Sequence, residues 1–234
     1  MKISRSFKIV LITLGLVVMI LLIVISRLWT LKNNQTYYDE LEDALKNPER
    51  AEALVMRNRK MVTLSAEIGK LSHLKILNIG NNELKDLPPE IGQLKELEEL
   101  SVENNLLISL PEEILKLNRL RKINLNKNRL THFPWINPQS IEEIHVCANN
   151  IVTIPGEIRN MKQLKVIDLA ENQIVQIPDD VIFPDSITKL DFFHNGLIHA
   201  SPSLFSMPGL RELILEDNPL DTVSVELYKK FKKH

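Results

Sequence analysis

Asparagine recurs along this chain at a nearly constant interval, and that interval constrains the fold more than any other feature. The seven positions are Asn82, Asn105, Asn128, Asn149, Asn172, Asn195 and Asn218. The gaps between them are 23, 23, 21, 23, 23 and 23 residues. Internal periods of this size are typical of proteins built from stacked structural repeats.

Each of these asparagines ends the same apolar phrase. In the first repeat, Leu74, Leu77 and Ile79 precede Asn82, and later repeats keep the same spacing. Such a coil cannot bury its own apolar side, so it must stack against neighbouring coils to form a continuous core. An amide side chain both donates and accepts hydrogen bonds. Repeated in register, the seven asparagines predict a ladder that satisfies buried backbone groups, and we assign this Asn ladder a structural role.

An apolar residue followed by proline recurs after most of the asparagines, as in Leu87-Pro88 and Leu110-Pro111. Together with the apolar phrase, this step resembles the leucine-rich repeat, in the 23-residue form found in bacterial proteins, over roughly residues 38–225. The resemblance implies an α/β solenoid with a curved parallel sheet on its concave face, non-catalytic and suited to binding other proteins. About eight repeats are expected, because a degenerate unit with Arg59 at the asparagine position precedes the seven regular ones.

The ends of the array and its third repeat depart from the pattern. Residues 36–46 begin with Thr36 in a capping-box arrangement, which predicts a cap helix over the first coil. We therefore expect the leucine-rich repeat domain over residues 36–225, followed by a C-terminal cap and basic tail over 226–234. The third repeat is two residues shorter around Phe133 to Pro138, which predicts a tighter outer arc.

An uncharged apolar run, residues 9–26, lies between Lys8 and Arg27. As a helix it would be about 27 Å long, close to the ~30 Å of a bilayer's hydrocarbon core. We expect a transmembrane signal-anchor over residues 9–27, after a cytoplasmic n-region at 1–8 and before a linker at 28–35. The excess of basic residues before the run favours a cytoplasmic N-terminus and extracytoplasmic repeats. Cleavage as a signal peptide, which would give a secreted protein, is the alternative.

The charges are unevenly distributed along the chain. Residues 31–228 hold all 30 acidic residues and 21 of the 29 basic ones, a net charge of −9. This balance argues against a nucleic acid partner, because phosphate binding needs a basic surface. The single cysteine excludes an intramolecular disulfide. We expect a monomeric repeat domain held together by packing alone.

The candidate binding residues lie between the apolar positions of the strands, where side chains should face solvent on the concave side. Because neighbouring strands lie ~4.8 Å apart, His145, Asp168 and Asp191 on three successive strands should stand side by side there. An exposed phenylalanine beside them could anchor a partner, since aromatic residues are common interface hot spots. The candidate protein-binding residues are His145, Asp168, Asp191, Phe193, His194 and Glu171. The alternative reading is that they are ordinary solvated strand residues.

The sequence predicts neither catalysis nor a cofactor. It lacks a Gly-x-Ser-x-Gly elbow, a phosphate-binding glycine-rich loop and a His-Glu-x-x-His motif. His145 and Cys147 lie two residues apart on one strand, but without oxyanion donors we expect a solvated thiol with an ordinary pKa. The histidines and aspartates of the candidate site spread along a curving surface rather than converging on one ion, so no metal is expected.

These features favour a membrane-anchored, non-catalytic module that binds a protein ligand. Two other functions stay open. One is a structural or adhesive surface component that binds polymer or host matrix. The other is a cytoplasm-facing scaffold like the Ras-group leucine-rich repeat proteins. Surfaces that bind polymers usually expose more aromatic side chains than Phe193 alone, and this favours a protein ligand.

Overall fold

The computed structural model describes residues 36–233 apart from 137–138 and 179–180. The expected signal-anchor at residues 9–27 and its flanking segments lie outside these residues. Across the part that is described, no helix is both long enough and apolar enough to span a bilayer. The described residues from Tyr37 onward belong to one compact unit.

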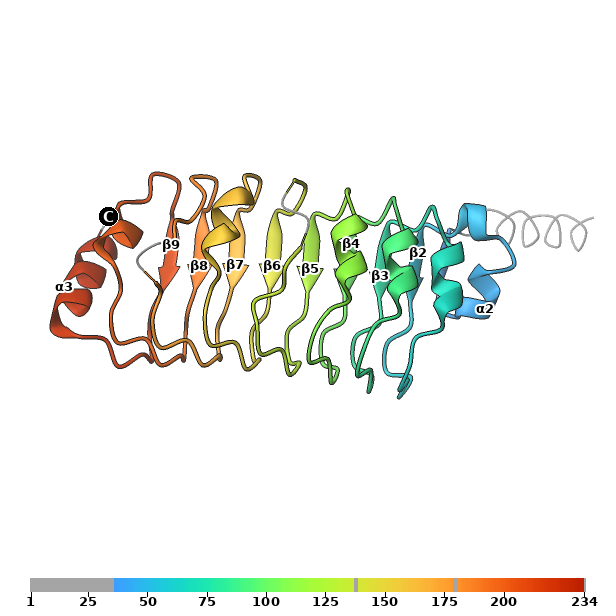
Figure 1. Ribbon diagram of the computed structural model, residues 1–234, viewed down its shortest axis with the longest axis horizontal. Helices are drawn as coiled ribbons and strands as arrows, with labels where there is room; N and C mark the ends of the chain where they lie inside the picture. Colours follow the sequence, from blue (N-terminus) through green and yellow to red (C-terminus); the bar gives the residue numbers. More distant parts are fainter. Residues whose placement is uncertain (1–35, 137–138, 179–180, 234) are drawn as a thin grey trace, which may run out of the picture. The chain divides into compact units, whose positions relative to one another are not determined.

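This unit is built on a nine-stranded parallel sheet whose strands follow the order of the sequence. Figure 1 shows β2 to β9 side by side along the array. The strands are β1 (Tyr37–Tyr38), β2 (Ala53–Val55), β3 (Ile76–Asn78), β4 (Glu99–Ser101), β5 (Lys122–Asn124), β6 (Glu143–His145), β7 (Val166–Asp168), β8 (Lys189–Asp191) and β9 (Glu212–Ile214).

From β2 onward, every strand buries its middle residue and turns the two flanking residues outward. Leu77 and Ile123 are fully buried at the centres of β3 and β5, for example. The register is regular, because Leu77 pairs with Leu100 and Ile123 pairs with Ile144. These observations confirm the predicted α/β solenoid with a parallel sheet. We call the solvent-facing side of the sheet the strand face.

The Asn ladder forms as predicted and joins each coil to the one before it. The Asn128 amide donates to the carbonyl oxygens of Val102 and Leu125, both at 3.0 Å. Its oxygen accepts from the backbone N–H of Leu107 at 3.0 Å. Asn149 repeats the same arrangement one coil later. Since these backbone groups are buried, each amide satisfies donors and acceptors that water cannot reach.

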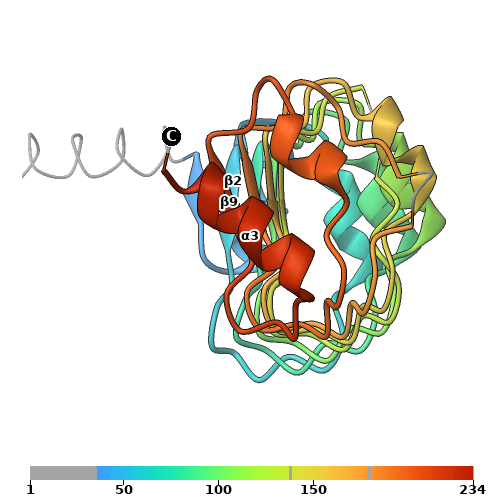
Figure 2. The ribbon, with the colours of Figure 1, turned by 90° about the vertical axis from the view of Figure 1, so that its left-hand side faces the viewer.

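On the side opposite the sheet, most coils pass through a short 3₁₀ helix, as Figure 2 shows on its right. These helices are η2 (Ala66–Lys70), η3 (Pro89–Gln93), η4 (Glu112–Lys116), η5 (Gly156–Asn160) and η6 (Pro202–Ser206). The proline step leads into them with extended backbone, as at Pro88 (ψ 146°) and Pro111 (ψ 148°). Each helix buries one apolar residue towards the sheet, such as Ile91 or Ile114. We call this side of the coil the outer arc.

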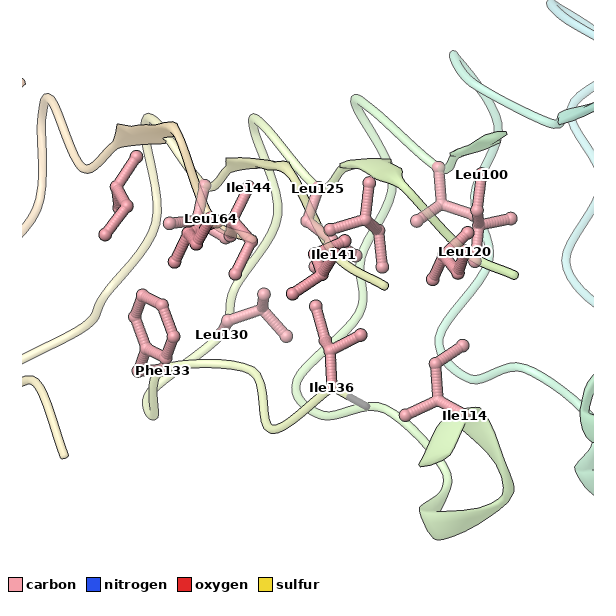
Figure 3. Close-up of a cluster of buried hydrophobic side chains, with 14 of the residues drawn as sticks. Leu100, Ile114, Leu120, Leu125, Leu130, Phe133, Ile136, Ile141, Ile144 and Leu164 are labelled. Atoms are coloured by element: carbon pink, nitrogen blue, oxygen red, sulfur yellow. The ribbon is translucent and has the colours of Figure 1, made fainter. Parts of the chain in front are cut away.

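The third repeat has no 3₁₀ helix among its described residues. In the second repeat the core isoleucine Ile114 follows Pro111 by three positions, whereas Ile136 follows Pro134 by two. Ile136 is nonetheless fully buried, and Figure 3 shows it within the apolar core of this region. The shortened arc therefore keeps its core residue and loses the helical turn around it.

The predicted cap helix over 36–46 is wrong at its N-terminal end. Tyr37–Tyr38 form strand β1, which pairs in parallel with β2, and Tyr38 is buried. The helix α2 is confined to Leu41–Ala44 and is followed by the 3₁₀ helix η1 (Pro48–Arg50). The added strand pairs backbone groups with β2 and buries the ring of Tyr38 over the first coil. This stabilisation outweighs the local preference of a capping box for a helix.

The C-terminal boundary also differs from the expected 225/226. Helix α3 spans Thr222–Phe231, and Asp221 caps it by accepting from the backbone N–H of Ser224 at 2.7 Å. The Tyr228 hydroxyl donates to the Leu213 carbonyl and accepts from the Leu215 N–H, both at 3.1 Å. Figure 2 shows α3 lying across the end of the coil. The helix thus supplies polar contacts that a further repeat would otherwise provide at this sheet edge.

Candidate functional site

His145, Asp168 and Asp191 form a row on the strand face of β6, β7 and β8. The parallel register pairs His145 with Asp168, and Asp168 with Asp191. The His145 Nδ1 lies 3.8 Å from an Asp168 carboxylate oxygen, and its Nε2 lies 3.2 Å from Glu143. The nearby Asp168 carboxylate raises the pKa of the imidazole, and burial opposes that rise. The row is therefore as close as the repeat spacing predicts.

The two aspartates of this row also have a structural role that the sequence reasoning missed. Asp168 accepts a hydrogen bond from the Ala170 N–H at 3.2 Å, and Asp191 accepts one from the Phe193 N–H at 2.9 Å. Asn124, at the equivalent position of β5, accepts a hydrogen bond from the Asn126 N–H in the same way. One oxygen of each carboxylate is thus used to terminate a strand. The signal was present in the sequence, because Asn and Asp recur at this offset.

Asp168 and Asp191 carry the same charge, whereas the neighbouring cross-strand pairs of the strand face carry opposite charges. Elsewhere, adjacent strands bring opposite charges together, as Lys122 and Glu143 at 2.9 Å and Lys189 and Glu212 at 2.7 Å. Asp168 and Asp191 are instead like-charged cross-strand partners. No basic side chain of the described chain lies within ion-pair distance of the Asp191 carboxylate. Burial raises the pKa of Asp191, and the adjacent Asp168 charge raises it further.

Phe193 lies just beyond the row, whereas His194 and Glu171 occupy the following turns. The Phe193 side chain remains 40% exposed, and its ring centroid is 6.0 Å from that of His194. His194 forms an ion pair with Asp217 of the next coil, which raises the pKa of its imidazole. The structure therefore does not bring His194 into contact with the two aspartates of the row.

The turn position occupied by Glu171 and His194 has a left-handed backbone in every regular repeat. The φ angles there lie between 51° and 57° for Asn81, Asn104, Lys127, Ala148, Glu171, His194 and Asp217. Asparagine and aspartate tolerate this conformation better than other side chains do. The alanine at position 148 does not by itself indicate a left-handed backbone. The geometry of these turns is set by the stacking of the coils rather than by local preference.

Cys147 differs from expectation. Burial raises the pKa of its thiol to about 12, and the negative charges of Asp168 and Glu171 add to the effect. The expected ordinary pKa is therefore wrong, because burial, and to a lesser extent the carboxylates of the candidate site, oppose ionisation of the thiol. A thiol that stays protonated at neutral pH is a poor nucleophile. Over the described parts of the chain, no three His, Cys, Asp or Glu side chains are arranged to hold a metal ion.

The described fold and part of the sequence match known proteins. The family of the leucine-rich repeat region matches residues 53–148. A leucine-rich repeat protein of Leptospira interrogans is 26% identical, with a TM-score of 0.58, over 83% of this chain and 74% of that one. No curated protein matches the sequence closely.

Two further solved structures share the fold at lower identity. An internalin of Listeria monocytogenes is 19% identical with a TM-score of 0.71, and the match covers 82% of this chain and 55% of that one. The leucine-rich repeat ectodomain of the plant membrane receptor kinase GASSHO1/SCHENGEN3 from Arabidopsis thaliana is 20% identical with a TM-score of 0.66. That match covers 79% of this chain and 23% of the ectodomain chain. The repeat phrase, the Asn ladder, the parallel sheet and these matches agree that the chain is a leucine-rich repeat protein.

Proposed function

We propose that the repeat domain is a non-catalytic module that binds a protein ligand on the strand face of β6, β7 and β8. The observation that supports this location is the pairing of Asp168 with Asp191 on adjacent strands. Like charges directly opposite each other destabilise a sheet, and departures from favourable local chemistry tend to mark functional sites. A lysine or arginine of a ligand would remove this repulsion.

Apolar side chains lie beside the pair of aspartates. Phe193 is 40% exposed at the end of β8, and Ile214 lies beside Asp191 on β9. A buried aromatic anchor surrounded by polar contacts is typical of protein interfaces. The plant ectodomain with this fold is in complex with Casparian strip integrity factor 2. We extend the capacity to bind a protein to this chain on the basis of its strand face.

We further propose that residues 9–27 anchor the protein in a membrane with the repeats outside the cytoplasm. The support is the uncharged run between Lys8 and Arg27 and the excess of basic residues before it. A reporter enzyme that is active only outside the cytoplasm, fused after the last residue, tests the orientation. An inactive but stably expressed fusion would favour the cytoplasm-facing scaffold instead.

The binding site is tested by chemical crosslinking and affinity capture from the native cell. The test variant combines Asp168→Lys, Asp191→Lys and Phe193→Ala. The matched control combines Glu83→Lys, Asp86→Lys and Val62→Ala, which change the net charge equally and remove one exposed apolar side chain, at positions away from the strand face. Circular dichroism must first show that both variants fold.

Three outcomes separate the hypotheses. A protein captured by the wild type and the control but lost by the test variant supports the proposed site. Equal capture by all three chains would keep the binding function and move it off the strand face. If no chain captures a protein, the structural or adhesive function becomes the better explanation.

A further inference from the structure

A second candidate surface lies on the outer arc of the third repeat, away from the strand face. Two open grooves, of about 540 Å³ and 440 Å³, meet there. His132, Phe133 and Trp135 line both of them, so the grooves form one continuous depression. We call it the Trp135 groove.

The groove follows from the shortened arc. Helices η4 and η5 belong to the second and fourth repeats, and no described residue between them forms a 3₁₀ helix. Ile136 alone fills the core position, because the residues that would surround it in a helical turn are missing. The neighbouring arcs therefore stand as two walls, with Pro111 on one side and Pro155 on the other.

Apolar side chains remain exposed in this depression. Trp135 is 38% exposed, Leu115 is 37% exposed and Ile108 is 63% exposed. Core packing does not require the indole, since Ile136 and Phe133 already occupy the interior at this level (Figure 3). A contiguous apolar patch of this kind on a polar surface is typical of an interaction site.

The lining indicates what would bind. Grooves lined by aromatic side chains recognise polyproline II segments, because that conformation is extended and already ordered before binding. Glu112 lies on the lining of one groove and Glu157 on that of the other. Both carboxylates are exposed, and neither forms an ion pair within the described parts of the chain. No lysine or arginine lines either groove. The charge of the rim therefore complements a basic ligand.

We propose that the Trp135 groove binds an extended, proline-rich polypeptide segment that carries a lysine or arginine beside its prolines. The prolines pack on the indole and on the apolar walls, and the basic residue reaches Glu112 or Glu157. This site lies on a different face from the proposed strand-face site, so each can fail without the other.

The test uses the full chain in a Trp29→Phe background, which leaves Trp135 as the only tryptophan. A short polyproline peptide with an arginine at one end is titrated while the indole fluorescence is recorded. Fluorescence anisotropy of the labelled peptide gives the affinity independently. Two comparison peptides replace the arginine by glutamate or replace the prolines by glycine and serine.

Three variants locate the site. Trp135→Ala, read by anisotropy, should weaken binding at least about tenfold, because the apolar platform is removed. The double variant Glu112→Lys, Glu157→Lys should weaken binding of the arginine peptide about fivefold and tighten binding of the glutamate peptide. Glu90→Lys is the matched control, since Glu90 lies on η3 of a regular repeat, outside the groove. It should leave both affinities unchanged.

The result expected is saturable binding of the arginine peptide, with a change in indole fluorescence and weaker binding of both comparison peptides. No saturable binding to the wild type would overturn the proposal, as would equal affinity for the Trp135→Ala variant. Equal affinity for the glycine-serine peptide would also overturn it, because binding would then need only charge. If Trp135→Ala instead changed the sedimentation coefficient of the chain alone, the groove would be a contact between copies, and the proposal would fail.

Discussion

The Asn ladder and the outer arc belong to the same coils, yet one repeats with little change and the other varies. Asn105, Asn128, Asn149 and Asn172 each accept from an equivalent backbone N–H at 3.0 Å. Asn149 keeps these bonds even though the repeat before it is two residues shorter. On the outer arc the same shortening removes a helix and opens the Trp135 groove.

The difference has a physical cause. Buried N–H and C=O groups need partners at a fixed distance and direction, and leaving one unpaired costs about 1–3 kcal/mol. The outer arc needs only an apolar residue that fills the core, and the hydrophobic effect has no preferred direction. The arc can therefore vary in length and shape, and new surfaces can arise there without loss of the stack.

The largest expected effect breaks the ladder itself. Asn128→Leu should lower the free energy of unfolding by about 4 kcal/mol, because two carbonyls and one N–H lose their partners at ~1–3 kcal/mol each. Urea unfolding followed by circular dichroism measures the change. Asn160→Leu, at an exposed position of η5, is the control and should change stability by less than about 0.5 kcal/mol. Similar values for the two variants would contradict the special role of the ladder.

On the outer arc, the core residue Ile136 should contribute more to the stability of the fold than the groove residue Trp135. Ile136→Ala should cost about 3 kcal/mol, because it leaves a cavity at a fully buried position. Trp135→Ala should cost less than about 1 kcal/mol, because the indole is partly exposed and does not fill the core. The same urea experiment compares them. A larger loss for Trp135→Ala would show that the indole supports the fold rather than a ligand.

A smaller effect concerns the left-handed turns beside the ladder. Ala148 has a φ of 54°, which strains an alanine but not a glycine. Ala148→Gly should therefore raise the free energy of unfolding by about 0.5 kcal/mol, after the extra entropy of glycine in the unfolded chain is subtracted. A shift of the urea midpoint to higher concentration at unchanged m-value is the expected result. A lower midpoint would mean that the turn does not strain the alanine.

An effect of similar size is a dependence of stability on pH at the one strand end where histidine replaces Asn or Asp. The pKa of His145 is raised in the folded state, chiefly by Asp168, and Glu143 adds to this while Lys122 opposes it. The stabilisation is thus fully present below the unfolded pKa of about 6.5 and is lost as pH rises through the raised folded value.

Asp168→Asn tests this, because the amide keeps an acceptor for the Ala170 N–H but removes the charge. The wild type should lose about 0.5 kcal/mol more stability than this variant between pH 6 and pH 9, as expected for a partly exposed ion pair. Thermal unfolding at several pH values measures the difference. Parallel pH profiles would show that Asp168 does not set the protonation of His145.

The sequence predicted much of the strand side of this protein. The interval between asparagines gave the number of regular coils, the buried middle residue of each strand and the juxtaposition of His145, Asp168 and Asp191. This succeeded because parallel coils stack in register even where one outer arc is two residues shorter. A residue's neighbours across the sheet are then the residues one period away in the chain.

Several features were decided by contacts between coils, which the repeat phrase does not contain. The pairing of Tyr37–Tyr38 with β2 replaced the expected start of the cap helix, and Tyr228 of α3 closes the far edge of the sheet. The high pKa of Cys147 depends on burial and on carboxylates from neighbouring strands. These effects depend on surroundings in space, which local propensity does not specify.

The sequence by itself determined that this chain forms a stacked leucine-rich repeat domain, because the Asn ladder and the buried apolar positions recur in every regular coil. The tertiary structure alone decided what its surfaces offer. Among the described residues, no lysine or arginine lies within ion-pair distance of the like-charged Asp168 and Asp191, and the Trp135 groove opens between two arcs. Both depend on which side chains from different coils meet. The repeat fixes the position of each backbone segment, but burial and charge at the surface are set by the whole stack.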